Sequence, residues 1–416
     1  MPMDRRTFLG RSLGLVTISA LVPRFGVAGT SRFFEESIEA APDRVLVILE
    51  LAGGNDGLNT VVPYTDGLYR SLRATIAVPA ASVLDLDGRL GLNPVMTGMK
   101  SLWDSGRVAI VPGVSYPNPN LSHFTSRDIW HTADPALAER RGWLGRWADE
   151  NLAGTANPLS GCAISQSLPR TLLADKVVIP SFSSLNAYSY TTDGNYPGDS
   201  TNQLNAFVAE NSTEYEVVNR ISRIGATARD ATSSSAILRN VASNDIPRAT
   251  YPANGLGNAL KVVAQVITGD VGTRILYVTY GGFDNHSNQK TDHDNLLRNL
   301  SDAIKAFFDD LDAQNKSSNV LLMTWSEFGR RVQENGSLGT DHGTAGPQFV
   351  VGGAVTRGIY GPPPSLSALD RNGNLTWQTD FRSYYGTILQ DWLGADAPAI
   401  LGAGYPNVGF VNRSYA

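Results

Sequence analysis

The feature that most constrains this sequence is a set of continuously apolar, β-branched runs, each followed by glycine and polar residues. The runs stand at residues 45–49, 108–111, 275–280, 320–324 and 348–351. An unbroken apolar run of this length predicts a strand that is buried on both faces, as in a parallel sheet covered by helices. The chain is therefore expected to fold as an α/β protein.

Helical periodicity alternates with these runs. The clearest case spans residues 292–311, where large apolar residues recur at helical spacing on one face, and Thr291 is expected to cap this helix. Shorter helices are predicted at 96–103, 124–130 and 256–266. The alternation indicates a mostly parallel sheet flanked by helices, with the functional site beyond the carboxyl ends of the strands.

The first thirty residues have the pattern of a twin-arginine signal peptide. Arg5 and Arg6 precede a weakly apolar run at 13–22 and small residues at 27–29. The apolar run is too short to remain as a membrane helix. We predict that residues 1–30 are recognised by the twin-arginine export machinery and that the mature chain works in the periplasm or outside the cell, with no permanent membrane span.

Composition limits the organisation and partners of the mature chain. Residues 42–416 are predicted to form a single domain, with a polar insertion at about 183–253 that covers the sheet edge or the site. The formal net charge of −5 argues against nucleic-acid binding. The single cysteine, Cys162, excludes an internal disulfide and is expected to be a small buried apolar residue.

Histidine and aspartate pairs near two predicted strands form the main metal-site candidates. Asp284 and His286 follow the run at 275–280, and Asp341 and His342 precede the run at 348–351. Carboxylate and imidazole together suit zinc, manganese or iron. His293, at the start of the long helix, is either a further ligand or a buried, hydrogen-bonded histidine.

Two further acids follow predicted strands. Glu327 comes just after the run at 320–324, where it is either a metal ligand or the ion-pair partner of Arg330 or Arg331. Asp56 follows the first run and is either a ligand or a turn acid, since Asp-Gly is a common turn pair.

Ser122 is the candidate nucleophile. It follows one predicted strand and precedes a short predicted helix, whose N-terminus would favour an anionic substrate. A hydroxyl deprotonated by a metal could attack phosphorus or sulfur there. A serine that only caps the helix fits the sequence equally well.

Taken together, these motifs resemble the exported bacterial family known as domain of unknown function 1501. The resemblance rests on residues 5–6, 53–60, 122–124, 142–144, 283–286, 324–330 and 341–343. That family is similar to the alkaline phosphatase and sulfatase superfamily, whose members usually hydrolyse phosphate or sulfate esters with two metals and a serine, threonine or modified cysteine nucleophile. The resemblance implies an alkaline-phosphatase-like α/β fold and an exported ester hydrolase.

The resemblance also implies roles for single residues. Ser122 matches the nucleophile and Asp56 the first metal-binding acid. Asp284 matches the acid of one metal site, and either His286 or His293 matches its histidine.

Two registers are possible for the remaining metal ligands. In the first, Asp341, His342 and Gly343 match an Asp-His-Gly motif of the superfamily. In the second, which we prefer, Glu327 takes the place of the acid and His342 is the last histidine ligand. Phe328 then stands where a histidine ligand is usual, so one metal site is expected to be altered, weak or absent.

The implied cofactor is a divalent metal, with zinc favoured, calcium, magnesium or manganese as alternatives, and the number of ions left open. The implied substrate is an anionic ester, either free or linked to a glycan. The competing hypothesis is a catalytically degenerate relative that binds an anionic glycan or a surface partner without turnover.

Overall fold

The computed structural model describes residues 44–155, 157–186, 188, 195–211 and 219–412. The predicted signal peptide, residues 1–30, lies outside these residues. None of the described helices combines the length and the apolar character needed to cross a bilayer.

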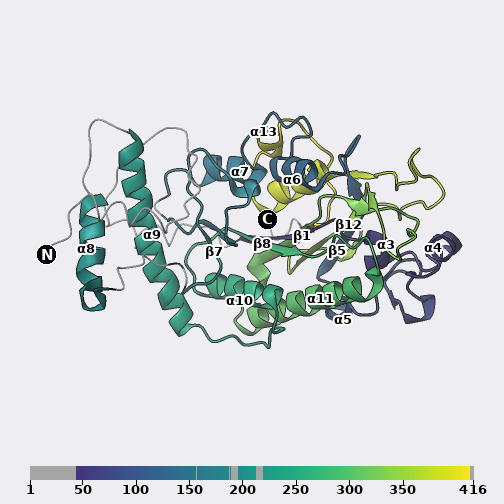
Figure 1. The fold of residues 1–416 in the computed structure, drawn as a ribbon, viewed down its shortest axis with the longest axis horizontal. Helices are drawn as coiled ribbons and strands as arrows, with labels where there is room; N and C mark the ends of the chain where they lie inside the picture. Colours follow the sequence, from purple (N-terminus) through teal and green to yellow (C-terminus); the bar gives the residue numbers. More distant parts are fainter. Residues whose placement is uncertain (1–43, 156, 187, 189–194, 212–218, 413–416) are drawn as a thin grey trace.

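A large sheet runs through the centre of the described chain (Figure 1). Its strands are β1 (Val45–Ala52), β5 (Val108–Ser115), β6 (Gly161–Ile164), β7 (Ser181–Phe182), β8 (Ile275–Gly281), β9 (Val320–Trp325), β12 (Gly346–Gly352), β13 (Gly358–Ile359) and β14 (Thr379–Asp380). The order is β13-β5-β12-β9-β1-β8-β6-β7, and β14 also pairs with β5. All of these pairings are parallel except those of β12. The predicted class, a mostly parallel sheet in an α/β fold, is confirmed.

Every predicted apolar run forms one of the central strands, which are β1, β5, β8, β9 and β12. β12 alone runs antiparallel to its neighbours β5 and β9. The connection from β9 to β12 contains the short antiparallel pair β10 (Gly329–Arg330) and β11 (His342–Gly343) and no described crossover helix. A chain that returns without a crossover can pair only in the antiparallel sense.

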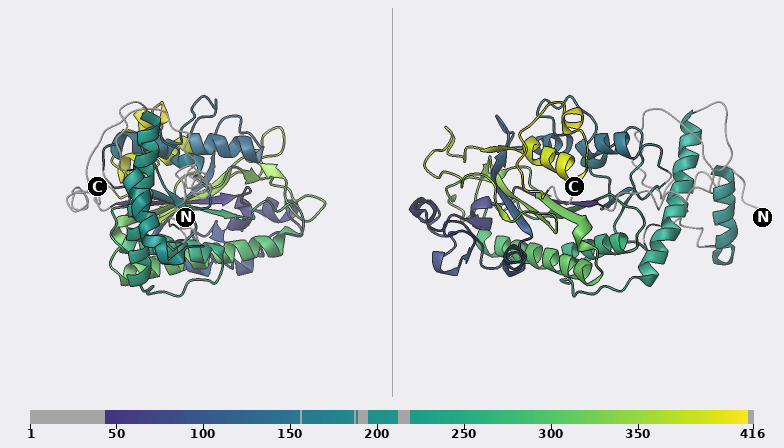
Figure 2. Two further views of the ribbon diagram at one scale, coloured as in Figure 1. Left: turned by 60° about the vertical axis from the view of Figure 1, so that its left-hand side comes forward. Right: turned by 180° about the vertical axis from the view of Figure 1, so that it is seen from behind.

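Helices cover both faces of the sheet (Figures 1 and 2). One face packs on α5 (Thr97–Asp104), α10 (Gly255–Thr268) and α11 (Gln289–Ala313). The other packs on α6 (His123–Thr132), α7 (Trp143–Asn151), α12 (Phe381–Thr387) and α13 (Ala397–Leu401). Alternate residues of β1 enter the two cores: Val47 and Leu49 on the first side, Leu46 and Ile48 on the second. Burial on both faces explains why the run is continuously apolar.

The long helix α11 begins earlier than predicted. Its first residue is Gln289, and its N-cap is Asn288 in the left-handed conformation, with φ of 44°. The backbone N–H groups of Asn288 and Gln289 donate to the carbonyls of Ser337 and Leu338. This tertiary pairing with a distant loop fixes the start of the helix, so the prediction of Thr291 as the cap is wrong.

The polar insertion forms helices. Its described part contains α8 (Ser200–Asn211) and α9 (Asn219–Asn244), which lie beyond the β7 end of the sheet (Figures 1 and 2). The carboxyl end of β1, where α3 (Gly57–Thr60) begins, lies away from this insertion. The described helices of the insertion therefore lie beside the β7 edge of the sheet and not over the carboxyl end of β1.

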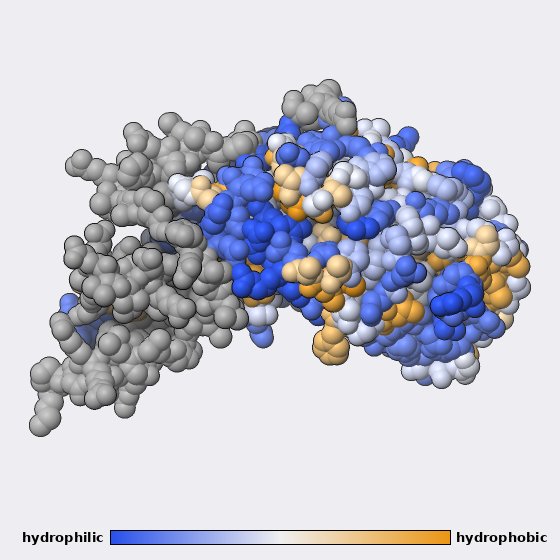
Figure 3. All heavy atoms as spheres, turned by 90° about the horizontal axis from the view of Figure 1, so that it is seen from above, coloured by the Kyte–Doolittle hydropathy of each residue, from blue (hydrophilic) through white to orange (hydrophobic). Residues whose placement is uncertain are grey.

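The remaining short elements are α4 (Gly67–Leu72) and a small sheet of β2 (Val61–Val62), β4 (Gly91–Leu92) and β3 (Leu84–Asp85). On the face drawn in Figure 3, apolar residues form small scattered groups in a mostly hydrophilic surface.

Candidate metal centre

Several polar loops meet at one edge of the sheet. Asp284 follows β8, Glu327 follows β9, and His123 begins α6 after β5. These three strands share one direction, so their carboxyl ends lie at the same edge. Because β12 runs the opposite way, its amino end, preceded by His342 on β11, lies there as well.

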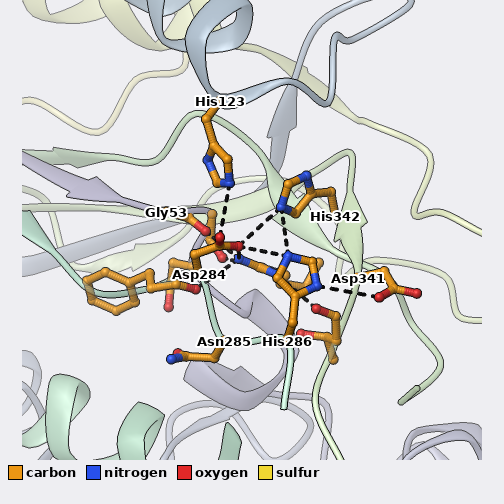
Figure 4. A network of polar contacts seen from close by, with 12 residues as sticks. Gly53, His123, Asp284, Asn285, His286, Asp341 and His342 are labelled. Carbon is orange, nitrogen blue, oxygen red and sulfur yellow. Dashed lines mark hydrogen bonds and ion pairs between the residues drawn. The ribbon is translucent and has the colours of Figure 1, made fainter. Parts of the chain in front are cut away.

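The carboxylate of Asp284 is the centre of this cluster (Figure 4). Its Oδ1 atom lies 2.9 Å from Nε2 of His286 and 3.2 Å from Nε2 of His342. Its Oδ2 atom lies 3.4 Å from Nε2 of His123. One ligand atom each from His123, Asp284 and His342 can be chosen so that all lie within 4.8 Å of one another. Asp284, His286 and His342 therefore lie in contact, but His286 is not part of this three-residue group, and the role of these residues as metal ligands stays a prediction.

Hydrogen bonds at the opposite ring nitrogens define the tautomers of two histidines. Nδ1 of His342 lies 2.9 Å from the carbonyl oxygen of Leu121, which can only accept. Nδ1 of His123 lies 2.8 Å from Oε1 of Glu327. In the neutral imidazoles both Nδ1 atoms therefore carry the proton, and both Nε2 atoms present a lone pair on the side of Asp284.

His286 is the third histidine in contact with Asp284. Its Nδ1 atom lies 3.5 Å from Oδ1 of Asp341, and its Nε2 atom lies 3.1 Å from Nε2 of His342. Asp341 therefore lies behind His286, on the side away from Asp284 (Figure 4). Asp341, predicted as a direct metal ligand, instead contacts His286, which is itself a candidate ligand.

Glu327 is buried, with 1% of its side chain exposed, and its carboxylate binds Nδ1 of His123. The backbone N–H of Gly53 donates to both carboxylate oxygens, at 2.9 and 3.1 Å. Burial by itself raises the pKa of Glu327, but the hydrogen bonds from His123 and Gly53 outweigh it and lower the pKa. The hydrogen bond to Glu327 also raises the pKa of His123. The alternative to metal binding, an ion pair of Glu327 with Arg330 or Arg331, is not found among the described residues, where His123 is the ion-pair partner of Glu327.

Arg330 binds Asp284 instead, with 2.8 Å between Nη2 and Oδ1. Burial raises the pKa of Asp284, but the hydrogen bond from Arg330 and its positive charge prevail and lower the pKa to about 2. The carboxylate is therefore ionised throughout the neutral range. The guanidinium also donates to the carbonyls of Gly53, Gly54, Phe283 and Thr340.

Phe328 packs against the imidazoles instead of adding a ligand. Its ring centroid lies 4.8 Å from that of His123 and 4.4 Å from that of His342. The ring also lies so close to Gly54 that a Cβ atom at that position would overlap it. Glycine at 54 and phenylalanine at 328 therefore fix the back of the cluster together.

Asp56 and His293 lie in a separate buried network. Asp56 forms an ion pair of 2.6 Å with Arg73, and Nε2 of His293 lies 2.9 Å from Oδ1 of Asn55. Burial raises the pKa of Asp56, but Arg73 lowers it below its usual range. Neither residue belongs to the metal-ligand group found among the described residues. Asp56 and His293, both predicted as ligands, thus bind other side chains of the protein: Asp56 binds Arg73, and His293 contacts Asn55.

Ser122 is the exposed N-cap residue of α6. Its hydroxyl makes no capping hydrogen bond, and its backbone N–H donates to Oδ1 of Asn120 at 2.8 Å. The next residue along the chain is His123, the first residue of α6. If Ser122 served only to cap the helix, its hydroxyl would accept a hydrogen bond from a backbone N–H of the first turn, and this bond is not made.

His123 is the site residue that sequence reasoning did not select. Its ring reaches the cluster only because α6 docks on the sheet, where Ser126 donates to the carbonyl of Glu327 and Arg127 binds the buried Glu50. The usable signal was its place at the start of a helix that follows a buried strand.

Fold and site together define an α/β protein with a histidine-rich cluster around one aspartate at the carboxyl edge of its sheet. The chain belongs to the family described as "Protein of unknown function (DUF1501)", whose model matches residues 114–377. The matched segment includes His123, Asp284, His286, Glu327 and His342. The family predicted from the sequence motifs is thereby confirmed.

Several solved structures show a remote similarity. One is a substituted form of the alkaline phosphatase PafA, with a TM-score of 0.31, 12% identity, 70% of this chain covered and 64% of that chain. Another is the lipoteichoic acid synthase LtaP from Listeria monocytogenes, with a TM-score of 0.29, 7% identity and coverage of 78% and 69%. A third is the phosphonate monoester hydrolase SpPMH from Silicibacter pomeroyi, with a TM-score of 0.29, 8% identity and coverage of 87% and 77%.

The chain thus spans less than two thirds of the length of PafA, and TM-scores at this level support no argument about activity. No curated protein sequence matches the chain.

Proposed function

We propose that this protein is an exported, metal-dependent hydrolase of phosphate or sulfate esters. The observation that carries the proposal is the convergence of the Nε2 atoms of His123, His286 and His342 on the carboxylate of Asp284. In their neutral form these imidazoles present lone pairs beside a carboxylate, and a divalent cation bound among them would match both kinds of ligand atom.

The residues fit a divalent metal. Nε2 of His123 is buried and makes no hydrogen bond among the described residues, as expected of a ligand atom that awaits a metal. Its Nδ1 atom is held by a carboxylate, which is the usual support of a metal-binding histidine. Three imidazoles and one carboxylate favour zinc, manganese or iron, whereas calcium and magnesium prefer oxygen ligands.

A divalent ion held by His123, His286, His342 and Asp284 would act as a Lewis acid toward the ester's charged oxygens. Ser122 is the proposed nucleophile, because its hydroxyl is exposed and adjoins His123. The N-terminus of α6, which the Ser122 side chain does not cap, favours an anionic substrate at the same place.

Export is proposed from the first thirty residues. Arg5 and Arg6 stand before a short apolar run, and replacement of both by lysine should retain the precursor in the cytoplasm. Normal export of this double variant, measured by cell fractionation, would contradict the twin-arginine route.

The test of activity is a panel of phosphate mono- and diesters, phosphonate esters and sulfate esters, assayed with metal-free protein and after addition of zinc, manganese or iron(II). We expect hydrolysis of at least one ester class that appears with metal and disappears with a chelator. If protein that holds stoichiometric metal hydrolyses none of them but binds an anionic glycan, the alternative of a catalytically degenerate binding protein is correct.

A further inference from the structure

We infer that Arg330 is a permanent internal cation of the metal centre and that the centre consequently takes one divalent ion. The inference rests on the proposed metal site and concerns its charge and stoichiometry. It begins with the burial of Arg330, whose side chain is 1% exposed although it lies against Asp284, which is 48% exposed.

The guanidinium occupies an oxygen-lined pocket built from three loops. Nε donates to the carbonyl of Gly54 at 2.7 Å, and Nη1 donates to that of Thr340 at 2.8 Å. Nη2 donates to the carbonyl of Phe283 at 3.0 Å and to that of Gly53. Such a convergence of carbonyl oxygens with one carboxylate is also the environment of a bound hard cation.

Two glycines permit this arrangement. Gly53 has φ of 120° and Gly54 has φ of 75°, both in the region that glycine adopts readily. A Cβ atom at Gly53 would overlap the backbone of Phe283 and Asp284, and one at Gly54 would lie 3.4 Å from Nε of Arg330. The loop after β1 is therefore shaped to turn its carbonyls onto this guanidinium.

The formal charges around the histidines match a single ion. The carboxylates that contact them belong to Asp284, Glu327 and Asp341, and carry three negative charges. Arg330 returns one positive charge and cannot lose its proton. Two negative charges remain, which one divalent ion neutralises, whereas a second ion would leave an excess of positive charge in a partly buried site.

The closing experiment titrates metal-free protein with Co²⁺ and counts equivalents by absorption and by elemental analysis. We expect saturation at one equivalent per chain. Two tight equivalents overturn the inference and leave the proposed function standing, whereas no binding overturns both. One equivalent without hydrolysis of any ester overturns the proposed function alone.

Variants at Arg330 test its role without any assay of activity. Arg330→Ala should lower the melting temperature by about 10 °C, since it removes a buried guanidinium and leaves four backbone carbonyls without their donor. Added methylguanidinium or Ca²⁺ should restore part of that loss by filling the pocket. Arg330→Lys keeps the charge but loses the fork geometry, so it should fold and still bind one Co²⁺, at least tenfold more weakly.

Arg331→Ala is the matched control, because this neighbouring side chain is exposed, and it should show neither the loss nor the rescue. If Arg330→Ala matches Arg331→Ala in melting temperature and is indifferent to both cations, Arg330 is not the internal cation. Should Arg330→Ala fail to fold even with methylguanidinium, the binding of two Co²⁺ equivalents by Arg330→Lys, which keeps the charge, would contradict the inference by itself.

Discussion

The Nδ1 atom of His123 lies 2.8 Å from Oε1 of Glu327, and this bond joins the start of α6 to the loop after β9. In the neutral imidazole the buried carboxylate holds the proton on Nδ1, which leaves the lone pair on the Nε2 atom that faces Asp284. Glu327, which the sequence motifs assign as a metal ligand, thus contacts His123 and orients the imidazole of that residue.

Glu327→Gln is expected to weaken metal binding about tenfold, because the amide keeps an acceptor for His123 but removes the charge that supports the imidazole. Isothermal titration of the metal-free protein with Zn²⁺ measures the change. The control is Glu334→Gln, an acid that accepts the backbone N–H groups of Thr75 and Ile76 away from the cluster. Equal dissociation constants for Glu327→Gln and the native chain would show that this carboxylate does not support the site.

Asp284→Asn should abolish metal retention and ester hydrolysis together. The amide still accepts a hydrogen bond from Arg330, but it lacks the negative charge on which the three imidazoles converge. Metal content after dialysis should fall at least tenfold. Asp292→Asn, at an exposed position in the first turn of α11, should retain metal. Full metal occupancy in Asp284→Asn would remove this residue from the site.

Ser122→Ala should leave metal content unchanged and reduce turnover by several orders of magnitude, since only the nucleophile is lost. The hydroxyl is exposed and makes no capping bond, so stability should change by less than about 0.5 kcal/mol. The measurements are metal analysis, thermal denaturation and initial rates on the best ester of the panel. A normal rate would mean that Ser122 only begins the helix and that another group attacks the ester.

Acid should destabilise the fold through His131. This histidine is buried, and burial lowers its pKa from 6.5 to about 4, while Nδ1 lies 2.6 Å from Oγ1 of Thr171. In the unfolded chain His131 therefore binds a proton near pH 6.5, whereas in the folded chain it binds this proton only near pH 4. The free energy of unfolding should be unaffected by this group above pH 7 and should fall by about 3 kcal/mol as the pH drops through that window.

The matched variant is His131→Gln, which cannot take up the proton. Urea denaturation of both chains at pH 7.5 and pH 4.5 should show a smaller loss of stability for the variant, because other titrating groups contribute equally to both. Identical losses would place the acid sensitivity elsewhere.

The sequence alone predicts much of the sheet and three of the four proposed ligands, for a physical reason. A continuously apolar run marks a strand buried on two faces, so the strand ends and the loops after them follow directly, and with them Asp284, His286 and His342. Strand ends do not reveal which way a loop side chain turns. Asp56 follows β1 as expected, yet it turns to Arg73.

Partners supplied by distant segments could not be inferred in the same way. His123 depends on how α6 docks, and α6 is fixed by the contact of Arg127 with Glu50 on β1. Arg330 stands three residues from Glu327, but the turn between them sends its side chain to Asp284, 46 positions away. Pairing of this kind is decided by packing and not by sequence spacing.

X-ray absorption at the metal edge of the zinc-loaded protein tests the central claim most directly, because it counts ligands without any substrate. We predict a coordination shell of three imidazole nitrogens and at least one carboxylate oxygen at about 2.0–2.2 Å. His123→Ala should lose one imidazole from that shell, and the buried His293→Ala should lose none. A shell without imidazole, or a protein that retains no metal after loading, would contradict the account.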